Sequence, residues 1–273
     1  MRRIQNWTVI NAPTPRFKRK LAGFLGRVAA MISEIPQVVE RSLAIVTGGS
    51  RGLGFVVARE LAKLGNRVLI VSKDPERAKA AAAEIGCEFE TVDFQDLIAT
   101  QNKFQEIAAK YGTPKILVLA HGVMSEKMSK TLRTTTEEWR RVMAVNLDST
   151  FIAVNTLAPA MAEARDGRVI IFSACLGRMS GPGNTGGLAP YRISKAGVNA
   201  LVRNLAHETV LGSRGFLVDA TCPNHSRTDM GGPDAPRSAE EGAATAIWLA
   251  TREFETGKDQ TGLFWEDKTV IPW

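Results

Sequence analysis

From residue 42 onward, short runs of apolar residues alternate with longer segments in which apolar residues recur every three or four positions. The short runs predict strands at Leu43–Val46, Val68–Val71, Cys87–Val92, Ile116–Leu119, Val169–Phe172, Leu217–Thr221 and Gly262–Trp265. The longer segments predict a first helix that ends near Leu64. They predict further helices at Glu76–Glu84, 98–110, Glu137–Ala164, Tyr191–Thr209 and 239–251. Continuous apolar strands alternating with helices indicate a parallel sheet covered on both faces. Residues 42–273 are therefore expected to form one doubly wound α/β domain with a mostly parallel, seven-stranded sheet.

Residues 1–41 precede this pattern as a basic extension. An apolar stripe at helical spacing runs through residues 16–35 and ends before Pro36; it comprises Phe17, Leu21, Phe24, Leu25, Val28, Ile32 and Ile35. Three interpretations remain open: a helix that packs on the body or a neighbouring subunit, a membrane-surface anchor, or an organelle-targeting segment. Every chemical motif lies after residue 46, so the extension is expected to be dispensable for chemistry.

Composition and charge narrow the class of protein. The chain has 273 residues, 44% of them hydrophobic and 23% charged, which is typical of a soluble globular domain. Of the net charge of +7, +6 falls in residues 1–41, where eight Lys and Arg face two Glu. Because the body is nearly balanced, nucleic-acid binding is not expected. The three cysteines, Cys87, Cys175 and Cys222, form no C-x-x-C, so no metal site is predicted. Their odd number and wide spacing predict a reducing, cytoplasmic location.

A glycine-rich loop follows the first strand and opens directly into a helix. Glycines in this position permit a tight turn and let the backbone approach a pyrophosphate at the helix N-terminus, although a purely structural turn is the alternative. The candidate cofactor-binding residues in this loop are Thr47, Gly48, Ser50, Arg51, Gly52, Leu53 and Gly54.

The end of the second strand bears on which dinucleotide is bound. NAD-binding folds place an acid there for the ribose 2′-hydroxyl, whereas this chain reads Val71-Ser72-Lys73. Ser72 can donate to a 2′-phosphate, and Lys73 and Arg51 can neutralise it, so NADP(H) is the predicted cofactor; the alternative is that both cations are solvated. Asp93, beside Phe94, is expected either to accept from the adenine amino group or to cap the next helix.

Tyr191 and Lys195 are four residues apart, which places them on one face of a helix. A lysine ammonium beside a phenol favours the phenolate and is expected to bring the pKa of Tyr191 down toward neutrality. Such a tyrosine can pass a proton to a carbonyl oxygen during hydride transfer.

Together these motifs resemble the short-chain dehydrogenase/reductase family, over roughly residues 42–273. The resemblance implies a Rossmann-type fold, a homodimer or homotetramer, Tyr191 and Lys195 as the catalytic pair, and Asn146 as a catalytic asparagine that holds a relay water. It also implies cofactor contacts after the fourth strand at Ala120 and Gly122, and near the nicotinamide at Pro223, Ser226 and Thr228.

The sequence departs from the family at several positions. The place of the catalytic serine falls on Ala174, and Ser173 faces the other way unless the insertion at residues 179–190 shifts the backbone, in which case Ser173 or Ser180 is a candidate. His121 and His225 also stand in altered motifs, and Cys175 is expected to be inert.

The expected activity is NADPH-dependent reduction of a ketone or aldehyde, with Tyr191 as proton donor and Ser173 as a further catalytic candidate. The alternative is a family member without redox activity that binds NADP(H) as a sensor or scaffold, or that catalyses a non-redox rearrangement. Only nine residues separate Thr228 from Ser238, and this short lid suggests an open pocket for a bulky or carrier-borne substrate.

Overall fold

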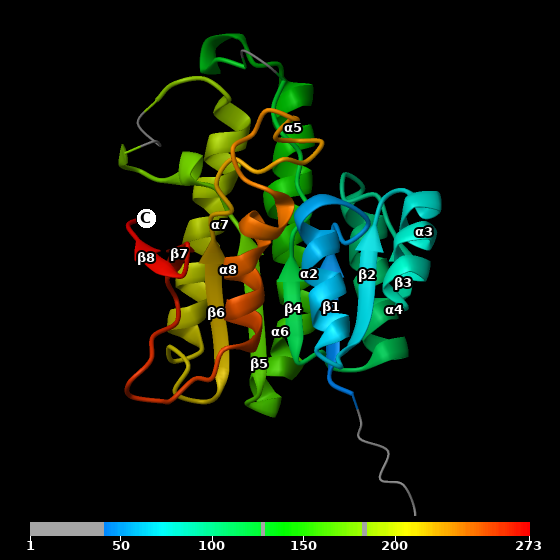
Figure 1. The fold of residues 1–273 in the computed structure, drawn as a ribbon. Coiled ribbons are helices and arrows are strands. Elements are labelled where there is room, and N and C mark those ends of the chain that lie inside the picture. Colours follow the sequence, from blue (N-terminus) through cyan, green and yellow to red (C-terminus); the bar gives the residue numbers. More distant parts are fainter. Residues whose placement is uncertain (1–40, 127–128, 182–184) are drawn as a thin grey trace, which may run out of the picture. The chain divides into compact units, whose positions relative to one another are not determined.

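The computed structural model describes residues 41–126, 129–181 and 185–273, so the expectations for residues 1–40 lie outside the described part. An eight-stranded sheet with the order β3-β2-β1-β4-β5-β6-β7-β8 forms the centre of the described body (Figure 1). Its strands are β1 Leu43–Thr47, β2 Arg67–Ser72, β3 Glu88–Thr91, β4 Ile116–Leu119, β5 Gly167–Phe172, β6 Phe216–Thr221, β7 Phe264–Glu266 and β8 Thr269–Ile271. The doubly wound, mostly parallel architecture is confirmed.

The expected strand count was one too low. β8 pairs antiparallel with β7, whereas all the other strand pairs are parallel. The connecting residues Asp267 and Lys268 both adopt positive φ, 49° and 59°, which is the backbone that a tight two-residue hairpin requires. β8 is three residues long and largely exposed, so it lacks the apolar run that predicts a strand.

Helices cover both faces of the sheet, as expected. On one face α2 (Gly52–Lys63) packs against α8 (Ala239–Thr251), and on the other α4 (Leu97–Tyr111) packs against α6 (Ser149–Ala164), with α7 (Ala189–Glu208) beside it over β6. Alternate residues of each strand enter the two cores: Ile45 faces one and Val46 the other. The remaining helix of this size, α3 (Pro75–Ile85), follows β2.

The helix expected at 137–164 is interrupted. α5 (Thr136–Met143) leads into a π-helical turn at Ala144–Asp148, and α6 continues from Ser149. A π turn adds a residue to the helical repeat and commonly marks a functional site. Here it carries Asn146, which is 1% exposed.

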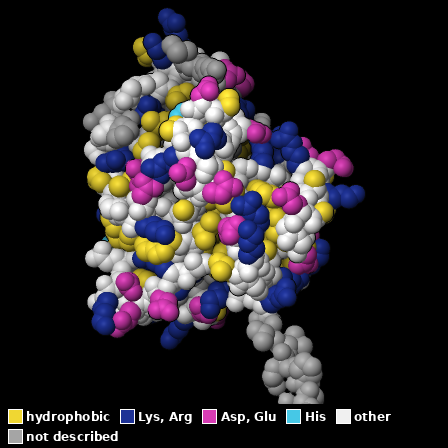
Figure 2. All heavy atoms as spheres, in the orientation of Figure 1, with side chains coloured by type: hydrophobic (Ala, Val, Ile, Leu, Met, Phe, Trp, Pro, Cys, Tyr) yellow, Lys and Arg dark blue, Asp and Glu magenta, His cyan; other side chains and the backbone are white. Residues whose placement is uncertain are grey.

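Because β1, β4, β5 and β6 run parallel, the loops that follow them meet at one edge of the sheet. On the face seen in Figure 2, Lys and Arg side chains lie interspersed with Asp and Glu, in keeping with the near-zero net charge of the body. None of the helices in the described ranges is long and apolar enough to span a bilayer.

Candidate functional site

The glycine loop between β1 and α2 is packed so tightly that side chains are excluded. A Cβ on Gly54 would lie 2.4 Å from the carbonyl oxygen of Gly48, and one on Gly49 would lie 2.6 Å from the side chain of Ile70. Gly48 and Gly52 have positive φ, 67° and 56°, which L side chains rarely adopt. The loop therefore presents bare backbone at the start of the helix.

The N-terminus of α2 is free to receive an anion. Arg51, at the N-cap, makes no side-chain cap, and the first turn holds no acidic residue. Thr228 lies across from this turn, because a Cβ on Gly52 would approach its Cγ2 to 3.2 Å. Leu53 packs into the core on the α8 face. Open N–H groups, a helix dipole and bare backbone fit the pyrophosphate of a dinucleotide.

The residues expected near a ribose phosphate gather at the ends of β2 and β3. Ser72 is buried, and its Oγ accepts a hydrogen bond from the Ser50 amide at 3.2 Å. Lys73 Nζ lies 2.8 Å from Asp93 Oδ2. Burial raises the pKa of Asp93, but hydrogen bonds from Lys73 and the Gln95 amide outweigh burial and lower it overall. Asp93 thus pairs with a cation while also accepting from a backbone amide in the following turn.

Two more cations, Arg51 and Arg77, share a different acid. Arg51 forms an ion pair with Asp229, and Arg77 Nη1 lies 3.7 Å from the same carboxylate. The side chains of Arg51, Arg77 and Asp229 are all more than half exposed. Arg51 and Arg77 are thus held by Asp229, and Lys73 by Asp93, through solvent-accessible ion pairs that an anionic group can displace.

Tyr191 and Lys195 lie together on α7, as the spacing predicts. Tyr191 is 6% exposed and Lys195 5%, and Lys195 Nζ lies 6.0 Å from the centroid of the tyrosine ring. Lys195 Nζ donates to the Phe172 carbonyl at 2.7 Å, and no carboxylate of the described residues lies within 4 Å of it. Burial lowers the pKa of Lys195 to about 8.

The expected fall in the pKa of Tyr191 is wrong for this structure. Burial raises the pKa, and negative charge on Cys222 or Cys175 would raise it further. Lys195 does not counter burial because its ammonium is bound to the carbonyl of Phe172 instead of the phenol. The phenol therefore holds its proton at neutral pH.

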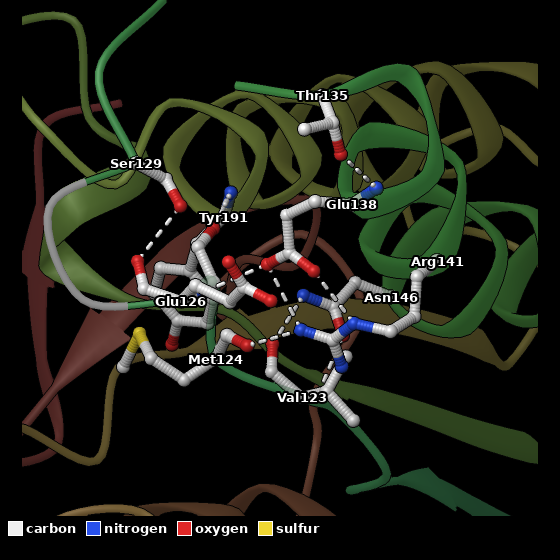
Figure 3. Close-up of polar contacts among 10 residues, drawn as sticks. Val123, Met124, Glu126, Ser129, Thr135, Glu138, Arg141, Asn146 and Tyr191 are labelled. Carbon is white, nitrogen blue, oxygen red and sulfur yellow. Dashed lines mark hydrogen bonds and ion pairs between the residues drawn. The ribbon is translucent and has the colours of Figure 1, made fainter. Parts of the chain in front are cut away.

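Asn146 connects the π turn to the loop after β4 (Figure 3). Its Oδ1 accepts from the Val123 amide at 2.8 Å, and its Nδ2 donates to the Val123 carbonyl and to Ser194 Oγ, both at 3.0 Å. A Cβ on Gly122 would lie 3.4 Å from Asn146 Oδ1 and 3.7 Å from Lys195 Nζ. The structure therefore brings Asn146, Gly122 and Lys195 to one point.

Two residues that the sequence analysis did not single out hold this loop and Tyr191 in place. Ser125 Oγ accepts a hydrogen bond from the Tyr191 amide at 2.9 Å. Buried Glu138 accepts from the Glu126 amide at 2.7 Å and from Arg141 at 2.7 and 2.9 Å (Figure 3). For Glu138 the available sequence signal was its place three residues before Arg141 on one predicted helix.

The position of the family's catalytic serine is occupied by Ala174, as counting along the fifth strand predicts. Ala174 packs with Tyr191 and Val142 in one small cluster. Ser173 points elsewhere: its Oγ donates to Asn199 Oδ1 at 2.5 Å and lies 3.4 Å from the Lys195 carbonyl. The structure therefore does not bring the Ser173 hydroxyl to Tyr191, and Ser180 is an exposed loop residue.

His121 lies beneath the glycine loop in a buried polar network. Its Nδ1 lies 2.6 Å from Thr47 Oγ1 and its Nε2 2.8 Å from Ser149 Oγ, and Phe94 stacks on its ring at 4.1 Å. Burial, and secondarily the charge of Lys195, lowers the pKa of His121 to about 3, so the ring is neutral. Thr47 and Phe94 contact His121, and Ala120 packs into the core at the same strand end.

The segment after β6 folds back on itself. Asn224 adopts a φ of 56°, which asparagine tolerates. Ser226 Oγ donates to the Pro223 carbonyl at 2.9 Å, and Thr228 Oγ1 accepts from the Gly231 amide at 3.1 Å. Exposed His225 is bonded to the Gly231 carbonyl at 2.8 Å and points to no other predicted site residue.

The arrangement combines a dinucleotide-shaped cradle with a buried phenol and a buried ammonium at one sheet edge. Within the described ranges no group of His, Cys, Asp and Glu has the arrangement of a metal site. Phenol and ammonium side chains of this kind suit proton transfer to a substrate oxygen.

The match to known proteins agrees with this geometry. The family model described as short chain dehydrogenase matches residues 42–238. The 3-oxoacyl-[acyl-carrier-protein] reductase of Escherichia coli is 32% identical over 193 residues, covering 70% of this chain and 76% of that protein.

Solved structures of dehydrogenases and reductases resemble the fold of this chain. A dehydrogenase/reductase from Sinorhizobium meliloti superposes with a TM-score of 0.69 at 28% identity, covering 82% of this chain and 92% of that one. An actinorhodin polyketide ketoreductase variant solved with NADPH superposes with a TM-score of 0.68 at 23% identity, covering 78% and 91%, which supports the fold alone.

Proposed function

The chain belongs to the short-chain dehydrogenase/reductase family of oxidoreductases, and from this premise we propose that it reduces a ketone or aldehyde to an alcohol with NADPH. One observation carries the proposal: Lys195 is a buried ammonium without a described counter-ion, beside Tyr191 and Asn146. Burying such a charge is costly, so its retention indicates a role in binding or chemistry.

Each side chain has a distinct part in the proposed reaction. Tyr191 donates its proton to the carbonyl oxygen of the substrate, and burial keeps that proton in place until it is needed. Lys195 would bind the ribose, and it stabilises the tyrosinate that remains and then passes a proton back to it. Asn146 holds a water that returns a proton to Lys195. The bound nicotinamide supplies the hydride.

The cofactor preference rests on the residues at the end of β2. Ser72 replaces the acid that would bind a ribose 2′-hydroxyl, and Arg51, Lys73 and Arg77 lie in the segments that follow the adjacent parallel strands β1 and β2. A 2′-phosphate would replace Asp93 and Asp229 as the partner of these cations. Thr47 to Gly54 would hold the pyrophosphate, and Pro223, Ser226 and Thr228 the nicotinamide.

The substrate class follows the relatives. Because the similar E. coli protein is named as a 3-oxoacyl-[acyl-carrier-protein] reductase, a 3-oxoacyl thioester is the first compound to test. The segment between Thr228 and Ser238 forms no helix, consistent with a pocket open to a bulky substrate.

We expect the protein to form a dimer or tetramer through α5, α6 and α7. Trp139, Phe151 and Ile193 lie on these helices and expose 37%, 51% and 43% of their surface. Sedimentation of wild-type protein and of Phe151→Glu would test this, with a shift to monomer expected for the variant.

A panel of carbonyl compounds, followed by NADPH absorbance, tests the activity. Tyr191→Phe removes the proton donor and is expected to lower turnover about 10²- to 10⁴-fold while leaving NADPH affinity unchanged. Equal turnover in wild type and Tyr191→Phe, on a substrate that the wild type reduces, would refute the assigned role of Tyr191.

A second candidate function is NADP(H) binding without redox chemistry. It is favoured by one observation: Ala174 occupies the serine position, and the Ser173 hydroxyl is bonded to Asn199. This function predicts tight NADPH binding in calorimetry together with no oxidation of NADPH by any member of the panel.

A further inference from the structure

Two thiols meet at the carboxyl ends of β5 and β6, beside the proposed active site. Cys175 follows Ala174 in the turn after β5, and Cys222 follows the last residue of β6. The Cys175 amide donates a hydrogen bond to Cys222 Sγ at 3.1 Å, so the two residues are in direct contact. Cys222 is 2% exposed, whereas Cys175 is partly exposed, so burial does not make Cys175 inert as the sequence analysis expected.

The surroundings divide the two sulfurs into different roles. The neighbouring Cys222 side chain is the main cause that lowers the pKa of Cys175. The Leu176 amide and Arg178 lower it further, whereas burial and Glu266 oppose. The neighbouring Cys175 side chain and burial raise the pKa of Cys222. The pair thus offers one reachable thiolate backed by one buried thiol, the arrangement of a reactive cysteine next to a resolving cysteine.

We propose that Cys175 and Cys222 form a modification site, at which a hydroperoxide converts the two thiols into a reversible disulfide. The Cys175 thiolate attacks a peroxide oxygen, so that an S–O bond forms, the O–O bond breaks and hydroxide or alkoxide leaves. Cys222 sulfur then attacks Cys175 sulfur, and the S–O oxygen departs as water with the Cys222 proton. The two sulfurs are oxidised and the peroxide is reduced.

The disulfide would constrain both sides of the catalytic centre. Ala174, the neighbour of Cys175, packs on Tyr191, and Pro223, the neighbour of Cys222, begins the proposed nicotinamide segment. Oxidation is therefore expected to abolish turnover until a dithiol reductant restores it. That consequence rests on the proposed function, whereas formation of the disulfide does not.

The chain contains its own control thiol. Cys87 is half-buried, and burial raises its pKa to about 11, so it is expected to stay unreactive. Cys87→Ser should therefore respond to peroxide as the wild type does.

Intact-mass and peptide analysis of the full chain after hydrogen peroxide treatment tests the proposal. A loss of about 2 Da is expected, with one Cys175–Cys222 cross-linked peptide that a dithiol reductant removes. Cys222→Ser should lose the cross-link and accumulate oxygen on Cys175. Peroxide that leaves both thiols free, or oxidises them separately in the wild type, would overturn the proposal, as would faster alkylation of Cys87 than of Cys175. The wild-type masses decide the matter even if a serine variant fails to fold, and they do so whether or not the protein reduces carbonyls.

Discussion

Two buried cations in this protein have opposite surroundings. Arg252 lies near the amino ends of the strands, 3.2 Å from Asp219 Oδ2 and 2.7 Å from the Gln260 carbonyl. Its guanidinium also lies over the rings of Trp248 and Trp265, at 4.8 and 5.0 Å. Lys195, at the carboxyl ends, has one described hydrogen bond, to a carbonyl oxygen.

This difference in surroundings suggests that the charge of Arg252 serves the structure and the charge of Lys195 serves the function. Asp219 also accepts from Trp265 Nε1 at 2.9 Å and from Thr261 and the Leu263 amide at 3.1 Å, so its oxygens are fully engaged within the fold. A buried cation paired with a carboxylate holds elements together, whereas a buried ammonium without a described carboxylate partner lowers the stability of the fold.

Asp219→Ala is expected to lower the free energy of unfolding by about 3–5 kcal/mol, because it leaves Arg252 buried without its carboxylate. Denaturant unfolding measures the effect. The matched control is Asp166→Ala, since Asp166 pairs with Lys115 at 2.7 Å on the surface and is expected to contribute at most about 1 kcal/mol. Equal losses in the two variants would show that the Asp219 cluster is not special.

Ala174→Ser is expected to raise turnover, because it restores a donor to the oxygen on which charge develops. One such donor contributes about 2.7–4 kcal/mol, or roughly 100- to 1,000-fold in kcat. Steady-state kinetics with an activated ketone measures it. Ser173→Ala is the companion variant and should lower stability, through the lost Asn199 bond, and leave kcat unchanged. The reverse outcome would show that Ser173 reaches the substrate.

Arg51→Ala combined with Lys73→Ala is expected to weaken NADPH binding while leaving NADH binding unaltered. Each charge-assisted contact to a phosphate contributes about 1.5–3 kcal/mol. Calorimetric titration with both dinucleotides measures it, and Lys63→Ala, an exposed cation at the far end of α2, serves as control. Parallel losses for NADPH and NADH would place these cations away from the 2′-phosphate.

Turnover is expected to decline above about pH 8, because Lys195, whose pKa burial lowers to about 8, then loses its charge. The slope should approach about tenfold per pH unit at most. A kcat profile measured in the reductive direction tests this. A rate that stays level to about pH 10, the ordinary range of a lysine, would show that the Lys195 charge does not limit turnover.

Much of the fold could be predicted from the sequence, because buried parallel strands are continuous apolar runs. Segments with a helical pattern separate these runs along the chain. The pattern missed β8, since three partly exposed residues carry no such signal. It also missed the π turn, because no glycine or proline separates α5 from α6. Both are set by tertiary contacts.

The candidate site could be predicted in part. The glycine loop, Tyr191 and Lys195 have fixed spacings and were found, and their placement together follows from strand order. The sequence did not predict where the Lys195 ammonium donates its hydrogen bond, so the predicted direction of the Tyr191 pKa shift was wrong. The roles of Ser125 and the thiol contact of Cys175 with Cys222 depend on residues distant in the chain, which local patterns do not join.

The contrast between the two cations predicts how Lys195 affects stability with pH. The folded chain has a lowered pKa of about 8, and the unfolded chain keeps the ordinary value of 10.5. Between these values the unfolded chain binds the extra proton, so the free energy of unfolding should rise with pH across that window and be lowest below it.

The most direct measurement is therefore the free energy of unfolding of Lys195→Met at neutral pH, beside its turnover. If Lys195 is an uncompensated functional cation, the variant should be inactive yet more stable than wild type, by up to about 3 kcal/mol. A variant that is inactive and less stable would contradict the account, because it would show that Lys195, like Arg252, is held by the fold for structure.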